Sequence, residues 1–267
     1  MSSSTQHTAV SLQAHALSTA QRLLGGTGKA SLMAYRIDSA KAIDVLAHGL
    51  TADGAAVVAV RRSEAPMLSQ PVDVRFDIQR EAAEAQVRIL AATIHLLGSV
   101  EWTCADDPMI ADLNLPEQIE WALAETDSML GILQPADRVM VHDGSGVAPI
   151  PFSEIATSTQ PSFPSRAEEL DAHDVVRALP GADLRNIHQG VVDQRLNGRI
   201  LSVKATPNGM PRHFDEVFCV DVDSFGIQLM HVGPDNTTVS FAGFAQPAND
   251  VDELSWRTLE LLLHSRP

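Results

Sequence analysis

Histidines are the residues of this sequence whose types and surroundings most readily suggest chemistry. Ten are scattered along the chain, and none forms an HxH pair or an HExxH motif, so the tight ligand pairs of structural zinc sites are absent. His48 sits in a predicted strand beside Gly49, and His95 lies in the most apolar predicted strand. His173 lies between acids in Leu170-Asp171-Ala172-His173-Asp174. A neighbouring carboxylate orients an imidazole and raises its basicity, which suits a metal or haem ligand. An ordinary surface or core histidine is the alternative at each position.

Two adjacent arginines form the second candidate group. Arg61 and Arg62 end a predicted strand just before Ser63. Two guanidiniums at a strand end hold a phosphate or a pair of carboxylates, and solvated surface charge is the alternative. The chain carries 16 Arg but only 3 Lys, in a protein of formal net charge −15. Arg61 and Arg62 are therefore the predicted cations for an anionic ligand.

Other patterns that carry chemistry are incomplete. The run from Gly25 to Ala30 lacks both the first glycine and the hydroxyl of a phosphate-binding loop. The turn that starts at Asp221 lacks the glutamate that closes a calcium loop. Cys104 and Cys219 have no basic sequence neighbour, so buried, inert thiols are expected. No catalytic constellation emerges from the residues alone.

Charge and hydropathy limit the partners and the compartment. The pI is near 4.9, and so acidic a protein repels nucleic-acid phosphates and anionic membrane surfaces. The sequence shows no signal peptide and no run of 18 apolar residues. Two distant cysteines imply no disulfide framework. We expect a cytoplasmic protein that binds neither nucleic acid nor membranes.

The first 150 residues are predicted to be mostly strands. A helix over residues 11–24 is ended by two glycines, and an Asp-Gly turn joins strands at 43–50 and 55–62. Residues 72–78 alternate apolar and charged side chains, which is typical of a strand with one face in a core. Residues 86–103 are predicted to form one longer strand, or two strands with a bend at Gly98. A helix follows Pro116, and residues 138–152 return to strand around a turn.

A stretch rich in Ser, Thr and Pro at 157–166 is the predicted boundary between two parts. The first domain is expected over residues 11–160 and the second over 161–267. The second part starts with helices over 167–196 and ends with a helix begun by Asp250 and Asp252. Between them lie four predicted strands, at 199–206, 216–222, 225–232 and 237–244. Strands do not alternate with crossover helices, so the fold class is α+β with antiparallel strands, and a doubly wound parallel sheet is excluded.

The layout resembles a known family. Residues 19–104, with GKASLMAYR, AIDVLAHGL, AAVVAVRR and VDVRFDI, resemble the first half of a flavin-type split β-barrel of the pyridoxamine-phosphate-oxidase-like fold. Residues 217–262 resemble the small α+β domain that follows the barrel in haem-utilisation proteins of the HugZ and HutZ type. The residues that carry this second likeness are Asp221, Asp223, Gly226, Leu229, Val239, Phe241, Pro247 and Leu254. The resemblance implies an antiparallel split β-barrel followed by a small α+β domain.

The resemblance also implies three alternative activities. The first is haem binding in haem and iron homeostasis, with or without haem degradation. The second is non-catalytic regulation of tetrapyrrole synthesis through contact with glutamyl-tRNA reductase. The third is an oxidoreductase that uses flavin mononucleotide (FMN), which Glu64, close to the presumed phosphate site, disfavours. Whether the protein is an enzyme stays open.

Under the haem alternative, the resemblance makes His173 the candidate axial ligand, with His188 in the next predicted helix as the second choice. His48, Arg61 and Arg62 complete the candidate cofactor-binding residues, with the barrel seam as the apolar cleft. The family resemblance further implies a homodimer.

Overall fold

Seven antiparallel strands form the larger of two sheets, and six of them close into a barrel. The computed structural model describes residues 2–266 apart from 39, 67–69, 105, 126, 159–161 and 208–212, and it leaves the side chains of residues 2–12, 109 and 111 undescribed. The strand order is β3-β2-β1-β4-β5-β6-β7, and pairing of β3 with β6 closes the barrel. The strands are β1 (Lys29–Met33), β2 (Ala42–Leu50), β3 (Ala56–Arg61), β4 (Val72–Glu81), β5 (Leu90–Cys104), β6 (Ser128–Asp143) and β7 (Gly146–Pro151).

Short helical segments connect or cover these strands. They are η1 (Arg62–Glu64), η2 (Pro108–Asp112), α2 (Glu117–Leu123) and α3 (Phe152–Ala156). Helix α2 packs its buried Ile119 against the outside of β3, next to Val57 and Ala59.

The smaller sheet has four antiparallel strands in the order β8-β11-β10-β9. Its strands are β8 (Gly198–Ala205), β9 (Glu216–Asp223), β10 (Gly226–Val232) and β11 (Asn236–Gly243). Three helices cover one face through a shared apolar cluster, namely α4 (Glu169–Arg177), α5 (Gly181–Val192) and α6 (Val251–Ser265). The other face packs Phe218 and Val220 against Ile89 and Ala91 beside the start of β5. The predicted α+β class, with a barrel and a second small sheet, is confirmed.

Several predicted elements are confirmed in detail. The Asp-Gly turn joins β2 to β3, where the Thr51 amide donates to the Ala55 carbonyl oxygen at 2.9 Å. In β4 the apolar side chains enter the barrel core, while Asp73 and Arg75 point outward. Helix α6 begins at Asp250, whose carboxylate accepts the Glu253 amide at 2.7 Å, so the predicted helix start is correct.

Two elements are longer than the sequence predicts, because each begins earlier. Helix α1 (Ser2–Leu24) begins nine residues before the predicted start, because small polar residues at 2–10 extend a helix whose apolar face begins only later. Strand β6 starts at Ser128 rather than near 138. Pro135 interrupts the strand pattern there, but it lies opposite Gly98 at an irregularity in the ladder, where a missing N–H is tolerated.

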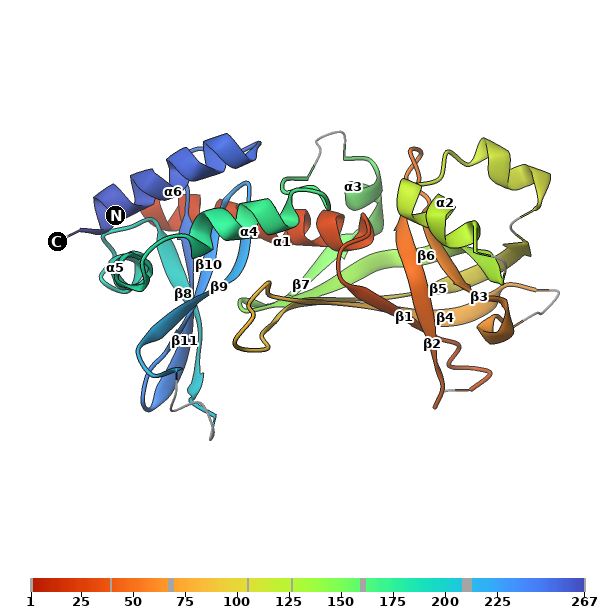
Figure 1. The fold of residues 1–267 in the computed structure, drawn as a ribbon, viewed down its shortest axis with the longest axis horizontal. Helices are drawn as coiled ribbons and strands as arrows, with labels where there is room; N and C mark the ends of the chain where they lie inside the picture. The colour runs from red at the N-terminus through yellow and green to blue at the C-terminus, as the bar shows by residue number, and fades with distance from the viewer. Residues whose placement is uncertain are drawn as a thin grey trace.

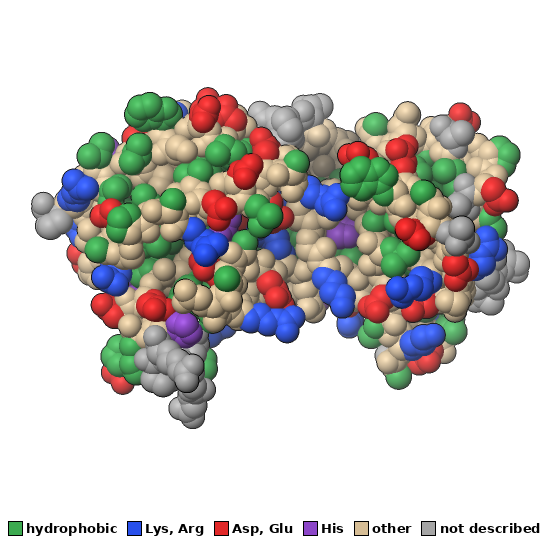
Figure 2. All heavy atoms as spheres, in the orientation of Figure 1, with side chains coloured by type: hydrophobic (Ala, Val, Ile, Leu, Met, Phe, Trp, Pro, Cys, Tyr) green, Lys and Arg blue, Asp and Glu red, His purple; other side chains and the backbone are tan. Residues whose placement is uncertain are grey.

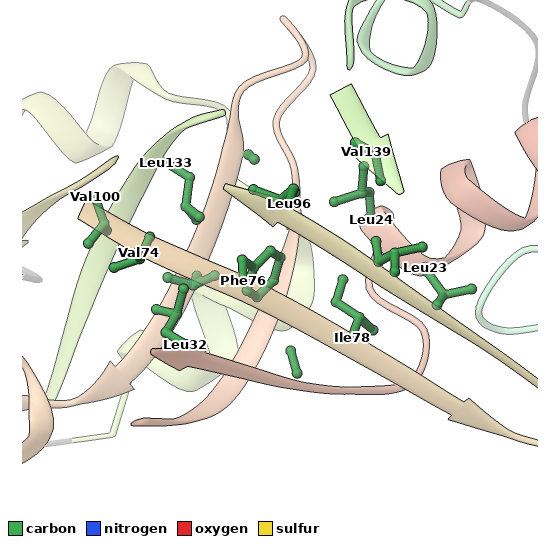
Figure 3. Packing of buried hydrophobic residues seen from close by; sticks show 14 of the residues in the cluster. Leu23, Leu24, Leu32, Val74, Phe76, Ile78, Leu96, Val100, Leu133 and Val139 are labelled. Atoms are coloured by element: carbon green, nitrogen blue, oxygen red, sulfur yellow. The ribbon is translucent and has the colours of Figure 1, made fainter. Parts of the chain in front are cut away.

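The barrel core is built from alternate residues of its strands and from one end of α1. Phe76 is 1% exposed and lies at the middle of the cluster, with Leu32 and Leu96 close by (Figure 3). Leu23 and Leu24 of α1 join the cluster near Val139 (Figure 3). Helix α1 thereby closes one end of the barrel.

A buried group of charges joins α1 and the barrel to the smaller sheet. Asp221 of β9 pairs with Arg22 of α1 at 2.8 Å and with Arg80 of β4 at 2.5 Å. All three side chains are at most 8% exposed. Burial alone would raise the pKa of Asp221, but Arg22 and Arg80 outweigh it and hold the pKa well below its usual value. We call the barrel with α2 and α3 one lobe, and the smaller sheet with α4, α5 and α6 the other. Helix α1 runs from one lobe into the other (Figure 1).

The predicted domain boundary between residues 160 and 161 lies outside the described residues and stays a prediction. Within the described part of the chain, no helix is long and apolar enough to cross a membrane.

We predict that Asp221→Asn lowers the free energy of unfolding by about 3–5 kcal/mol, because two buried guanidiniums lose their shared carboxylate. Urea unfolding followed by tryptophan fluorescence measures the change. The matched control is Glu260→Gln, which breaks the exposed Arg257–Glu260 pair and should cost under about 1 kcal/mol. Equal losses in the two variants would contradict the prediction.

Candidate functional site

A bulge in strand β6 opens a groove on the outside of the barrel. Leu96 pairs with Val139 and Gly98 with Pro135, so the three β6 residues 136–138 stand opposite the single residue Leu97. Such irregularities bend a strand and re-aim its side chains, and they are frequent next to functional sites. The groove has a volume of about 550 Å³, within the range of small-molecule sites. Its lining residues are Arg75, His95, Leu96, Leu97, Ala136, Asp137, Arg138 and Met140.

His95 stands in this groove because three strands place their outward residues in one row. Asp77 of β4 is the cross-strand partner of His95 in β5, and His95 is the partner of Met140 in β6. Directly opposite side chains on one face of an antiparallel sheet lie close enough to interact. The sheet register therefore brings a carboxylate, an imidazole and a thioether side by side.

Asp77 orients the imidazole of His95. Its Oδ1 lies 2.5 Å from His95 Nδ1, and its Oδ2 accepts two contacts of 2.8 Å from the Arg75 guanidinium. Because an ionised carboxylate only accepts, Nδ1 carries a proton, and Nε2 is the ring nitrogen left to act as a ligand. No described residue forms a hydrogen bond to Nε2, and the His95 side chain is 36% exposed. The arrangement matches the carboxylate–histidine pairs that support metal ligands.

The rest of the groove lining is part apolar and part charged, since it combines Leu96, Leu97, Ala136 and Met140 with Arg75, Arg138 and the exposed Asp137. Leu97 is 52% exposed and Met140 is half-buried. Arg138 is exposed, and none of the described acids forms an ion pair with it. His142 packs edge-on against His95, with ring centroids 5.0 Å apart. The groove can hold a flat apolar ligand, supply one imidazole nitrogen, and attract carboxylates at its rim.

A second cavity, of about 390 Å³, lies at the junction of the two lobes and contains the predicted ligand His173. His173 is 5% exposed, and its Nε2 lies 3.0 Å from the Cys219 carbonyl oxygen, so Nε2 carries the proton. Its Nδ1 has no partner among the described residues. The remaining walls are dominated by charge, from Lys29, Arg80, Arg88, Glu81, Glu169 and Asp221. Figure 2 shows Lys and Arg side chains beside carboxylates in the middle of the molecule, between the two lobes. An apolar disc would fit this cavity poorly.

The other predicted site residues are not brought together with His173. His48 is 4% exposed inside the barrel, with Nε2 2.7 Å from the Leu23 carbonyl oxygen, and burial lowers its pKa to about 4. His188 is 5% exposed, bonds the Ser240 hydroxyl at 2.8 Å, and also has its pKa lowered to about 4 by burial. Both imidazoles are therefore neutral and already engaged.

Arg61 and Arg62 lie at the end of β3 and in η1, and both are exposed. Strand β3 and helix α4, which carries His173, belong to opposite lobes (Figure 1). The Glu64 carboxylate of the same turn accepts the Asp44 amide at 3.2 Å. The two arginines therefore do not flank either cavity.

Sequence reasoning named His95 but missed its partners Asp77, Arg75 and Arg138. The alternation in β4 did place Arg75 and Asp77 on one outward face. The register that sets Asp77 opposite His95, and the bulge that exposes Arg138, have no clear sequence signal beyond Pro135.

Comparisons with known proteins bear on the fold. No protein-family model matches the chain, and no curated protein matches it either. A solved structure of a haem-binding protein from Mycobacterium smegmatis is similar, with a TM-score of 0.50 and 18% identity, covering 94% of this chain and 97% of that one. A protein of unknown function from Agrobacterium tumefaciens aligns over 94% of this chain and 96% of its own, with a TM-score of 0.36 and 14% identity, too low to support an argument. The first likeness shows that the barrel and the second sheet together form a fold that a solved structure also has.

Proposed function

We propose that this protein binds haem in the groove outside β4, β5 and β6, with His95 Nε2 as the axial ligand. The observation that carries the proposal is the imidazole of His95, held by Asp77 with its second nitrogen free in a partly apolar groove. Haem is a large apolar disc with a central iron and two propionates, and it needs an apolar wall, one ligating side chain and nearby cations. The haem-binding description of the similar Mycobacterium smegmatis protein supports this choice of ligand.

Each part of the ligand has a counterpart in the groove. Leu97 and Met140 offer apolar contact to the porphyrin face, and thioether and aliphatic side chains adapt well to flat ligands. Arg138 is available for a propionate, whereas Arg75 is already committed to Asp77. Hydrogen bonding to Asp77 makes His95 a more basic ligand. Bound haem would supply redox or oxygen chemistry, and nothing in the groove assigns one of these outcomes.

This proposal replaces His173 as the preferred ligand and leaves it as the alternative. His173 Nδ1 is free, but the charged walls around it favour polar ligands over a porphyrin. We do not extend the proposal to FMN, because the carboxylate of Glu64 lies beside the predicted phosphate-binding arginines. Haem degradation, the homodimer and a contact with glutamyl-tRNA reductase stay predictions.

We predict that hemin produces a Soret shift that saturates at one haem per chain. His95→Ala should weaken binding by more than about 100-fold, because it removes the ligand itself. His173→Ala is the matched comparison and should leave the titration unchanged. Loss of the shift in His173→Ala, with His95→Ala unaffected, would move the ligand to the junction cavity. Absence of any shift in the unmodified protein would remove haem from the account.

Asp77→Asn should lower haem affinity by about 10–100-fold, because an amide no longer fixes the proton on Nδ1 of His95. The matched control is Asp73→Asn, four residues earlier on the same outward face, where Asp73 pairs with the exposed Arg36. Hemin titrations of both variants at equal ionic strength measure the difference. Equal affinities in the two variants would contradict the orienting role of Asp77.

Arg138→Gln should weaken hemin binding by about threefold to tenfold at low salt, because a charged contact to a propionate is lost. The same substitution should have no effect on hemin dimethyl ester, whose propionates are neutral. Arg62→Gln is the control at the arginine pair predicted from the sequence. A loss in Arg62→Gln that is absent in Arg138→Gln would place the propionates at the end of β3 instead.

A further inference from the structure

Six ionisable side chains from four elements meet at the junction of the two lobes, away from the groove of His95. His15 and Arg22 come from α1, Arg80 from β4, Glu169 from α4, and Asp221 and Asp223 from β9. All but Glu169 are at most 8% exposed by side chain. The connections are direct, since Arg80 reaches both Asp221 at 2.5 Å and Glu169 at 2.8 Å.

His15 occupies the end of this group that faces Asp223. Its Nδ1 lies 2.7 Å from Asp223 Oδ2, and its Nε2 lies 4.0 Å from Asp221 Oδ2. The ring also packs on Phe241 of β11, with centroids 5.1 Å apart. His15 is therefore hydrogen-bonded to Asp223 and lies close to Asp221, while its Nε2 has no hydrogen-bond partner among the described residues.

Acidic groups outnumber basic groups around His15. Asp221, Asp223 and Glu169 carry three negative charges, while Arg22 and Arg80 carry two positive charges. Asp143, the last residue of β6, adds another negative charge nearby, although Glu169 is partly exposed to water. The buried 2.7 Å contact between His15 Nδ1 and Asp223 and this excess of negative charge favour the imidazolium form.

Asp221 and Asp223 are held by more partners than His15 is, so a change of pH affects them less. Asp223 Oδ1 accepts the Phe225 and Gly226 amides at 2.8 and 3.2 Å, which fixes the turn between β9 and β10. Asp221 is held by two guanidiniums. A change of protonation at His15 therefore affects how α1 packs against the smaller sheet, and it leaves the turn between β9 and β10 in place.

We propose that His15 is a pH-sensitive latch that holds α1 against the smaller sheet while it is protonated and loosens it when the proton is lost. Because α1 also places Leu23 and Leu24 in the barrel core, loosening at His15 weakens the attachment of one lobe to the other. The latch is independent of the proposed haem groove, so the two proposals can fail separately.

The direction of the pH dependence follows from the pKa. Burial lowers the pKa of His15, but the charge and hydrogen bond of Asp223, together with the charge of Asp221, outweigh it and raise the pKa above 6.5. A group whose pKa is higher in the folded state stabilises fully below its unfolded pKa. Its contribution is lost as the pH rises from about 6.5 through the folded pKa.

The test compares the full-length protein with His15→Gln and with the control His264→Gln, which changes an exposed histidine near the end of α6. Urea midpoints are measured from pH 6 to pH 9. We expect the midpoint to fall with rising pH in the unmodified protein and in His264→Gln, and to be flat over the same window in His15→Gln. The same fall in His15→Gln would overturn the latch.

A second measurement does not depend on the variant folding. NMR titration of the His15 ring in the unmodified protein should give a pKa above 6.5, and amide hydrogen exchange in residues 13–24, corrected for intrinsic rates, should accelerate as the ring loses its proton. A ring that titrates at or below 6.5, or exchange in 13–24 that does not follow the titration, would also overturn the latch.

Discussion

Asp221 accepts ion pairs from Arg22 and Arg80, which belong to the first helix and to a barrel strand, while Asp221 itself belongs to the smaller sheet. One carboxylate thereby joins three elements that are distant in sequence. The interaction is strong only as a complete set, because each buried charge alone would be heavily penalised. The positions of α1, of the end of β4 and of β9 consequently depend on one another. Since β4 also carries Arg75 and Asp77, the same strand links the junction to the groove.

The two halves of β4 show how one strand serves two purposes. Its inward residues from Val72 to Ile78 build the barrel core, and the inward face then continues into the junction at Arg80, while the outward face carries Arg75 and Asp77. Arg75 and Asp77 face the groove and orient His95, whereas Arg80 enters the junction. The core fixes the pleat, and the pleat fixes which side chains point outward. The proposed haem ligand therefore owes its orientation to packing on the opposite face of the same strand.

Local signals in the sequence predicted the element types well and the site incompletely. Alternation in β4, the Asp-Gly turn before β3 and the cap at Asp250 each depend on residues within a few positions of one another, so they could be read directly. The pairing of Asp77 with His95 depends on the register of two strands joined by a long hairpin. The groove depends on three residues bulging opposite Leu97. The negative charge around His15 comes from partners about 200 residues away in sequence. His173 stood out because its acidic neighbours are adjacent in sequence, although its imidazole is turned to the Cys219 carbonyl.

The central claim is that a carboxylate-oriented imidazole in a bulge-formed groove holds the iron of haem. A crystal structure of the protein with hemin tests it most directly. The account predicts that the iron is bound to His95 Nε2, with Nδ1 still on Asp77, the porphyrin against Leu97 and Met140, and a propionate at Arg138. Iron bound to His173 in the junction cavity, or a porphyrin anywhere outside the groove, would contradict it.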